Sequence, residues 1–245
     1  MPSGRTVLGE HEAPAHISYN LGKFEEAFGS GIEWIRVEPF SSRPFEFTAA
    51  TAGIVEEFKR AIEIADQGLL LAPRSNHLRL SKAFALASTG KLLEAKTLLK
   101  SINVDGADKT LECFKRANEG LIAFREGDQE KARRLYFDAI QGFRSLKDNY
   151  NMASAAVFMA REAFRAKDPH ALEILTGAKD ILTKTPKASV ANFVFLKAHK
   201  ELGLLDDALS NKLLSESGIQ LPRLQHQPIK WSTPDFGGTI KLTNN

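Results

Sequence analysis

The chain has 245 residues and a formal net charge of +3, and 43% of its residues are hydrophobic, enough for a substantial core. So small a charge permits an acidic partner but does not indicate nucleic acid, which requires a clustered basic patch. The single cysteine, Cys113, excludes an internal disulfide and fits a reducing compartment. No apolar run reaches about 18 residues, and the amino end lacks a signal-peptide core, so we expect a cytoplasmic protein without membrane association.

Residues 1–75 predict two degenerate helical units. In the second unit the segment RPFEFTAATAG is a poor first helix, because Pro44 and Gly53 both disfavour helical structure. The adjacent carboxylates of Glu56 and Glu57 follow it, and we interpret them as solvated side chains that point apart.

Residues 76–218 predict a more regular succession of helix–turn–helix units. A glycine followed five positions later by an alanine recurs, as in Gly90 with Ala95 and Gly127 with Ala132. The glycine can adopt the left-handed conformation that ends a helix, and the small alanine lets the next helix pack closely. The same pair also occurs outside these two units, at Gly22 with Ala27 and at Gly203 with Ala208.

Two segments that begin with Ala-Phe-Arg support this division into units. AFREGDQEKA begins at Ala123 and AFRAKDPHA begins at Ala163. We interpret them as the ends of equivalent first helices in adjacent units, with Lys167 standing where the earlier unit has Gly127. After residue 218 the helical pattern stops, and residues 219–245 predict an irregular tail.

These units resemble the tetratricopeptide repeat family, whose 34-residue unit has a small residue in its first helix and spaced alanines in its second. Gly22 and Gly90 are separated by twice this period, and the clearest copy has Gly120, Ala132, Tyr136 and Ala139 at the family positions. The resemblance implies an all-α, right-handed superhelix (an α-solenoid) of about five to six repeats. A plain helical bundle is the alternative.

The sequence contains no catalytic motif that we can identify. The six histidines form no HExxH motif and have no cysteine companion, and no glycine-rich phosphate loop is present. Cys113 is interpreted as a packing residue of a first helix. We therefore expect a non-enzymatic protein with no cofactor and no metal.

In the tetratricopeptide family, fixed positions of each first helix face a concave groove. Counting back from the turn places fifteen residues there, seven of which we select as candidates for partner binding. These are Phe124, Arg125, Arg161, Phe164, Arg165, Lys197 and Lys200. The other eight are Phe114, Ala117, Leu121, Ser154, Val157, Val190, Phe193 and Glu201. Five cations and two aromatic rings could hold a segment with acidic and apolar side chains.

The resemblance thus implies a scaffold or adaptor that binds a partner protein, or a peptide segment, in a basic groove. Two alternatives stay open at this point. The same cations could contact the phosphates of a nucleic acid in a regulatory protein. The chain could also be the helical accessory subunit of a larger enzyme complex.

Overall fold

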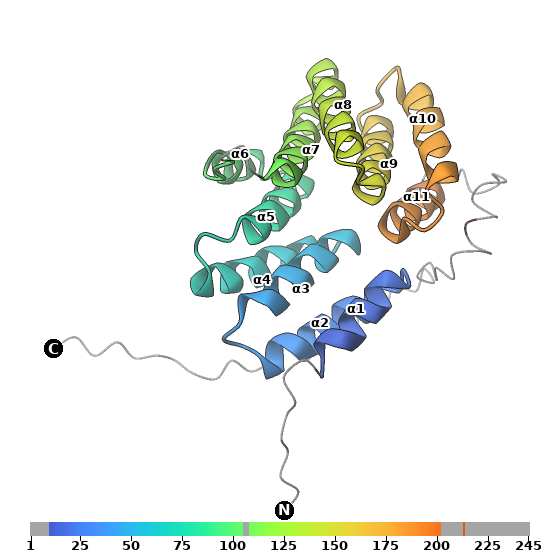
Figure 1. Ribbon diagram of the computed structural model, residues 1–245. Helices are drawn as coiled ribbons and strands as arrows, with labels where there is room; N and C mark the ends of the chain where they lie inside the picture. The colour runs from blue at the N-terminus through green and yellow to red at the C-terminus, as the bar shows by residue number, and fades with distance from the viewer. Residues whose placement is uncertain (1–9, 105–107, 202–212, 214–245) are drawn as a thin grey trace, which may run out of the picture.

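The computed structural model describes residues 10–104, 108–201 and 213 (Figure 1). These residues form eleven α-helices and no strand. The predicted tail at 219–245 and the last glycine–alanine pair, Gly203 and Ala208, lie outside the described residues. The helices are α1 (Glu12–Asn20), α2 (Phe24–Val37), α3 (Ser42–Ile54), α4 (Phe58–Leu71), α5 (Asn76–Ser88), α6 (Leu92–Lys100), α7 (Lys109–Glu126), α8 (Gln129–Ser145), α9 (Asn149–Arg165), α10 (Ala171–Lys184) and α11 (Ser189–Glu201).

Five tight turns join the first ten helices into pairs. Each turn contains one residue with positive φ, at Gly22, Glu56, Gly90, Gly127 and Lys167, so the intervals are 34, 34, 37 and 40 residues. The three glycines adopt this left-handed conformation without a steric penalty, whereas Glu56 and Lys167 carry a Cβ that opposes it. Lys167 shares this left-handed conformation with Gly127.

Aspartate side chains start three consecutive helices. Asp108, Asp128 and Asp148 precede α7, α8 and α9, and each carboxylate accepts a hydrogen bond from the backbone N–H three residues later. These bonds satisfy donors that have no partner inside the helix, which favours a sharp start at each position.

Small residues let the paired helices pack closely. Gly120 of α7 faces Tyr136 of α8, and a Cβ built on Gly120 would lie 2.6 Å from the Tyr136 Cδ2. Ala132 and Ala139 of α8 are fully buried, and Cys113 of α7 is also buried, as expected for packing residues. The local signals of the sequence therefore correctly predict this helix pair.

Helix α3 corrects one sequence prediction, since RPFEFTAATAG forms a continuous helix. Pro44 lies in the first turn, where its missing N–H would have no intrahelical partner. Gly53 lies in the last turn, and a Cβ there would approach the Phe84 ring to 3.2 Å. Two threonine hydroxyls, of Thr48 and Thr51, donate to backbone carbonyls one turn earlier. Neither Pro44 nor Gly53 therefore interrupts the helix.

The succession of helices curves until its amino-terminal part meets its carboxy-terminal part (Figure 1). The ring of Phe24 on α2 meets that of Phe193 on α11 edge to face, with centroids 5.0 Å apart. The turn between α3 and α4 also contacts α9 and α11 through ion pairs of Glu56. Among the described helices, none has the length and apolar composition that spanning a bilayer requires.

Candidate functional site

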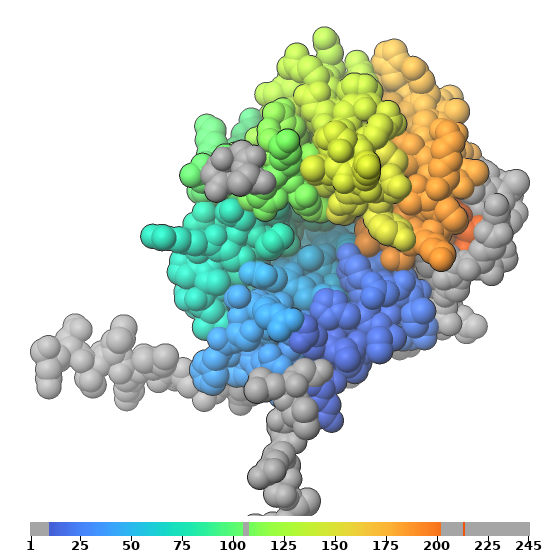
Figure 2. Space-filling model, in the orientation of Figure 1, coloured from blue at the N-terminus to red at the C-terminus, as the bar shows by residue number. Residues whose placement is uncertain are grey.

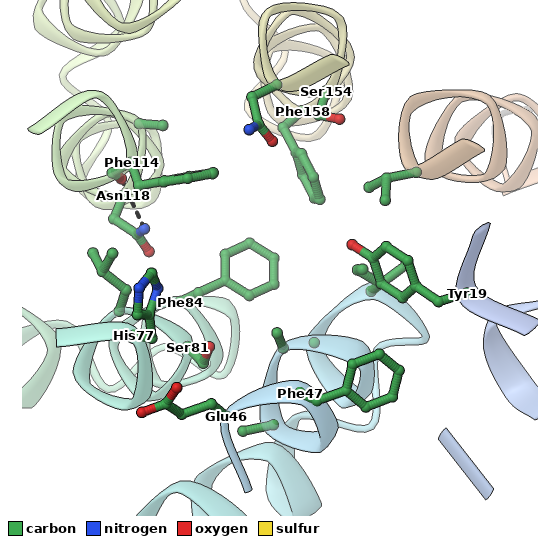
Figure 3. Close-up of a pocket in the computed structure, with 18 of the residues that line it drawn as sticks. Tyr19, Glu46, Phe47, His77, Ser81, Phe84, Phe114, Asn118, Ser154 and Phe158 are labelled. Carbon is green, nitrogen blue, oxygen red and sulfur yellow. Dashed lines mark hydrogen bonds between the residues drawn. The ribbon is translucent and has the colours of Figure 1, made fainter. Parts of the chain in front are cut away.

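A cavity of about 570 Å³ lies at the centre of the curved array. Figure 2 shows the molecule hollowed there, between the amino-terminal, central and carboxy-terminal helices. The first helix of each of the five pairs contributes one Phe or Tyr side chain, and these side chains point into the space in Figure 3. In chain order they are Tyr19, Phe47, Phe84, Phe114 and Phe158.

The aromatic rings are arranged by contact with one another. The Phe84 and Phe158 rings meet edge to face at 5.5 Å, and those of Tyr19 and Phe47 are tilted at 5.7 Å. Such geometries are favourable because the positive edge of one ring approaches the negative face of another. Burial raises the pKa of Tyr19 to about 12, so this phenol stays neutral near pH 7. The cavity is therefore lined mainly by apolar and aromatic surface, and Arg43 and Glu46 are its charged lining residues.

A few polar groups interrupt this surface. Ser154 Oγ donates to Tyr150 O, and Glu46 Oε1 accepts a hydrogen bond from Ser75 Oγ at 2.6 Å. Asn118 Nδ2 donates to Phe114 O at 2.9 Å, while its buried Oδ1 has no hydrogen-bond partner (Figure 3). An apolar cavity with a few polar groups is typical of a ligand-binding site.

Within the described ranges, no three His, Cys, Asp or Glu side chains gather closely enough to hold a metal ion. Burial raises the pKa of the Cys113 thiol, so the protonated form prevails near pH 7.

None of the seven residues predicted to bind a partner lines the cavity. They lie at or near the carboxyl ends of α7, α9 and α11. Phe124 is only 4% exposed, and its ring is 6.0 Å from that of Tyr136. Phe164 is partly buried against the same core. Lys200 follows Lys197 on α11 by one helical turn. The remaining cations come together around carboxylates of the chain itself.

Glu56 is the carboxylate at the centre of this arrangement. Its Oε1 lies 3.1 Å from Arg161 Nη1 and 3.3 Å from Arg165 Nη2, and its Oε2 lies 2.9 Å from Lys197 Nζ. Burial of the Glu56 carboxyl would raise its pKa, but the charges of Lys197, Arg161 and Arg165 outweigh burial and lower the pKa below its usual value. Glu56 is therefore ionised at neutral pH.

A second carboxylate, Glu162, extends the group, and its side chain is 1% exposed. Arg125 Nη2 lies 2.8 Å from Glu162 Oε2, and Arg161 Nη2 lies 2.9 Å from Glu162 Oε1. Arg165 also reaches both Glu162 and Glu201. We call these seven residues the Glu56 cluster: Glu56, Glu162, Glu201, Arg125, Arg161, Arg165 and Lys197.

The Glu56 cluster adjoins the cavity wall. The Arg161 guanidinium lies over the Phe158 ring, 4.6 Å from its centroid. Glu56 follows the cavity-lining residues Gly53 and Ile54 of α3 by a few positions. A ligand that fills the cavity could therefore also reach the cluster.

Sequence reasoning missed Glu56 and part of the aromatic lining. The prediction that Glu56 is solvated is wrong, since its side chain is 17% exposed and carries three ion pairs. Its neighbour Glu57 is exposed, as predicted. Position 56 lies midway between Gly22 and Gly90, so the 34-residue period could have placed it in a turn. Of the other eight residues counted as groove-facing, four do line the cavity, namely Phe114, Ala117, Ser154 and Val190, and the remaining four do not.

Comparison with known proteins identifies no relative, since no protein-family model and no curated protein matches the chain.

Proposed function

We propose that the chain is a non-enzymatic binding module of tetratricopeptide type, a right-handed superhelix of five to six helix–turn–helix repeats. The left-handed residues of the five turns within helix pairs support this, because their intervals of 34, 34, 37 and 40 match one such turn per repeat; Lys147, between α8 and α9, is left-handed as well. In this proposal the module is a cytoplasmic scaffold or adaptor, and a role as accessory subunit of a larger enzyme complex would use the same binding face.

The module holds a segment of a partner protein on the inner face of the array. The observation that carries this proposal is the convergence of five aromatic side chains, one from each of five successive first helices, on one cavity. Bulky apolar side chains of the partner fill this cavity, where burial of apolar and aromatic surface supplies most of the binding energy.

Charge distribution favours a protein partner over nucleic acid. Arg125, Arg161, Arg165 and Lys197 are paired with three carboxylates of the chain, so this group carries only one positive charge in excess and is not the clustered basic patch that a phosphate backbone requires.

Selection of a displayed library of random peptides against the chain tests the proposal. We expect enriched peptides to carry bulky apolar side chains. By calorimetry they should bind the Phe84→Ala variant about 30-fold more weakly than the wild type. Phe137→Ala is the matched control, because Phe137 lies on α8 with 56% exposure and outside the cavity lining. Equal affinity for both variants would show that the cavity is not the binding site.

A further inference from the structure

The cations of the Glu56 cluster were predicted to face the groove, yet they hold a carboxylate of the same chain. Glu56 belongs to the second helix pair, whereas its partners lie on α9 and α11. The sequence separations are 105 residues to Arg161 and 109 to Arg165. Lys197 also donates to Val55 O, across 142 residues. A surface suited to an acidic ligand is thus covered by an acidic residue from elsewhere in the chain.

The backbone at Glu56 is unfavourable for any residue other than glycine or asparagine. Its φ is 67°, and the preceding and following turns have Gly22 and Gly90 at the same place. Glu56 therefore lies in a turn whose backbone conformation favours glycine. Its ion pairs with the distant cations stabilise the carboxylate in this position.

The charges of the Glu56 cluster do not balance. It contains four cations and three carboxylates, so one positive charge is in excess. Arg161 is 4% exposed, and its Nη2 forms no hydrogen bond, although Glu162 Oε1 lies 2.9 Å away. A buried guanidinium with an unused donor is a favourable site for an additional carboxylate oxygen.

We propose that Glu56 occupies the site at which an acidic side chain of the partner binds. A partner segment that places Glu or Asp next to an apolar side chain in the cavity would displace Glu56 from Arg161, Arg165 and Lys197. The array would then open between the α3–α4 turn and α11. This inference rests on the proposed function, and it adds the acidic residue and the competition with Glu56.

Charge complementarity identifies the occupant as a protein segment that combines acidic and bulky apolar residues. The Arg161 guanidinium contacts the Phe158 ring, so both recognition elements lie within one short segment of a ligand. Bidentate binding by Arg161 and Arg165 favours a carboxylate over an uncharged amide.

The test compares Glu56→Gln with Glu57→Gln, which removes the same charge from the adjacent exposed residue. The probe is the blocked peptide acetyl-Gly-Phe-Glu-Leu-Phe-Gly-amide, with a second peptide that has Gln in place of Glu. Glu56→Gln should bind the Glu peptide about tenfold more tightly than the wild type, since no internal carboxylate competes. Glu57→Gln should bind like the wild type. Equal or weaker binding by Glu56→Gln would overturn the proposal.

Distance measurement between two spin labels gives an independent readout. The substitutions Lys59→Cys on α4 and Lys187→Cys before α11, both at exposed positions, provide the label sites in a Cys113→Ala background. The Glu peptide should lengthen the distance in the wild type, and Glu56→Gln should lengthen it without peptide. An unchanged distance in both cases would contradict opening of the array.

These outcomes separate the inference from the proposed function. Selected peptides that depend on Phe84, together with no gain of Glu-peptide affinity in Glu56→Gln, would retain the proposed function and refute the inference. If the higher Glu-peptide affinity of Glu56→Gln persists when Phe84 is replaced by Ala, the result would support competition between Glu56 and the acidic residue but refute binding in the cavity.

Discussion

The Glu56 carboxylate lies 3.1 Å from the Arg161 guanidinium although 105 residues separate them in the sequence. Arg161 is 4% exposed, so this pair is largely shielded from solvent. Removal of one partner from a buried ion pair leaves the other charge without compensation, which is more costly than loss of an exposed pair.

The pH dependence of stability should therefore depend on Glu56. Its pKa is lower in the folded chain than its usual value of 4.5, so its contribution is fully present above pH about 4.5 and is lost as the pH falls through the folded pKa. We expect the melting-temperature difference between wild type and Glu56→Gln to shrink as the pH falls from 7 to 3. Glu57→Gln should show a much smaller difference at every pH, and a constant Glu56→Gln difference would contradict the prediction.

Gly120→Ala should destabilise the chain by about 2 kcal/mol, because the added methyl group would overlap the rigid Tyr136 ring. The measurement is urea unfolding followed by circular dichroism. Gly177→Ala on α10 is the matched control, since a Cβ there meets no atom within 4 Å. The control should raise stability by about 0.5 kcal/mol through helix propensity.

Lys167→Gly should stabilise the chain by about 1 kcal/mol, because a non-glycine residue with φ of 52° is strained. Because the Lys167 side chain is exposed, its removal should cost little stability. Lys131→Gly, in the first turn of α8, removes the same kind of exposed side chain from helical backbone and should destabilise by up to about 1 kcal/mol. Thermal melting of the two variants should shift in opposite directions; shifts of the same sign would refute the backbone explanation.

Ser81→Phe should block binding while the fold is retained, because Ser81 lines the cavity between the aromatic side chains (Figure 3). Peptides selected on the wild type should lose about tenfold or more in affinity, and far-ultraviolet circular dichroism should be unchanged. Ser145→Phe, on the exposed end of α8, adds the same side chain away from the cavity and should bind normally.

The sequence predicted most reliably those features that depend on neighbouring residues. Gly127 and Ala132 indicated a turn and a close helix pair, and both are found where expected. Helix α3 was missed because the effect of Pro44 depends on its position, and the first turn tolerates a residue without an N–H.

The candidate site was harder to predict because its residues come from all parts of the chain. Counting from the turn glycine placed Phe114 in the groove, but the degenerate amino-terminal units gave no register for Tyr19 or Phe47. The cations Arg161 and Lys197 were selected for their position, while their partner Glu56 lies too far away in sequence for any local pattern to indicate the contact.

The meeting of Phe24 with Phe193 also has a consequence for how the chain unfolds. In an open array each unit depends on its immediate neighbours, and the terminal units can fray independently. Here α2 and α11 pack against each other, so loss of either helix exposes the packed surface of the other. We expect a cooperative unfolding transition in which truncation before α11 also weakens α2, and slow folding because these contacts join residues far apart in sequence.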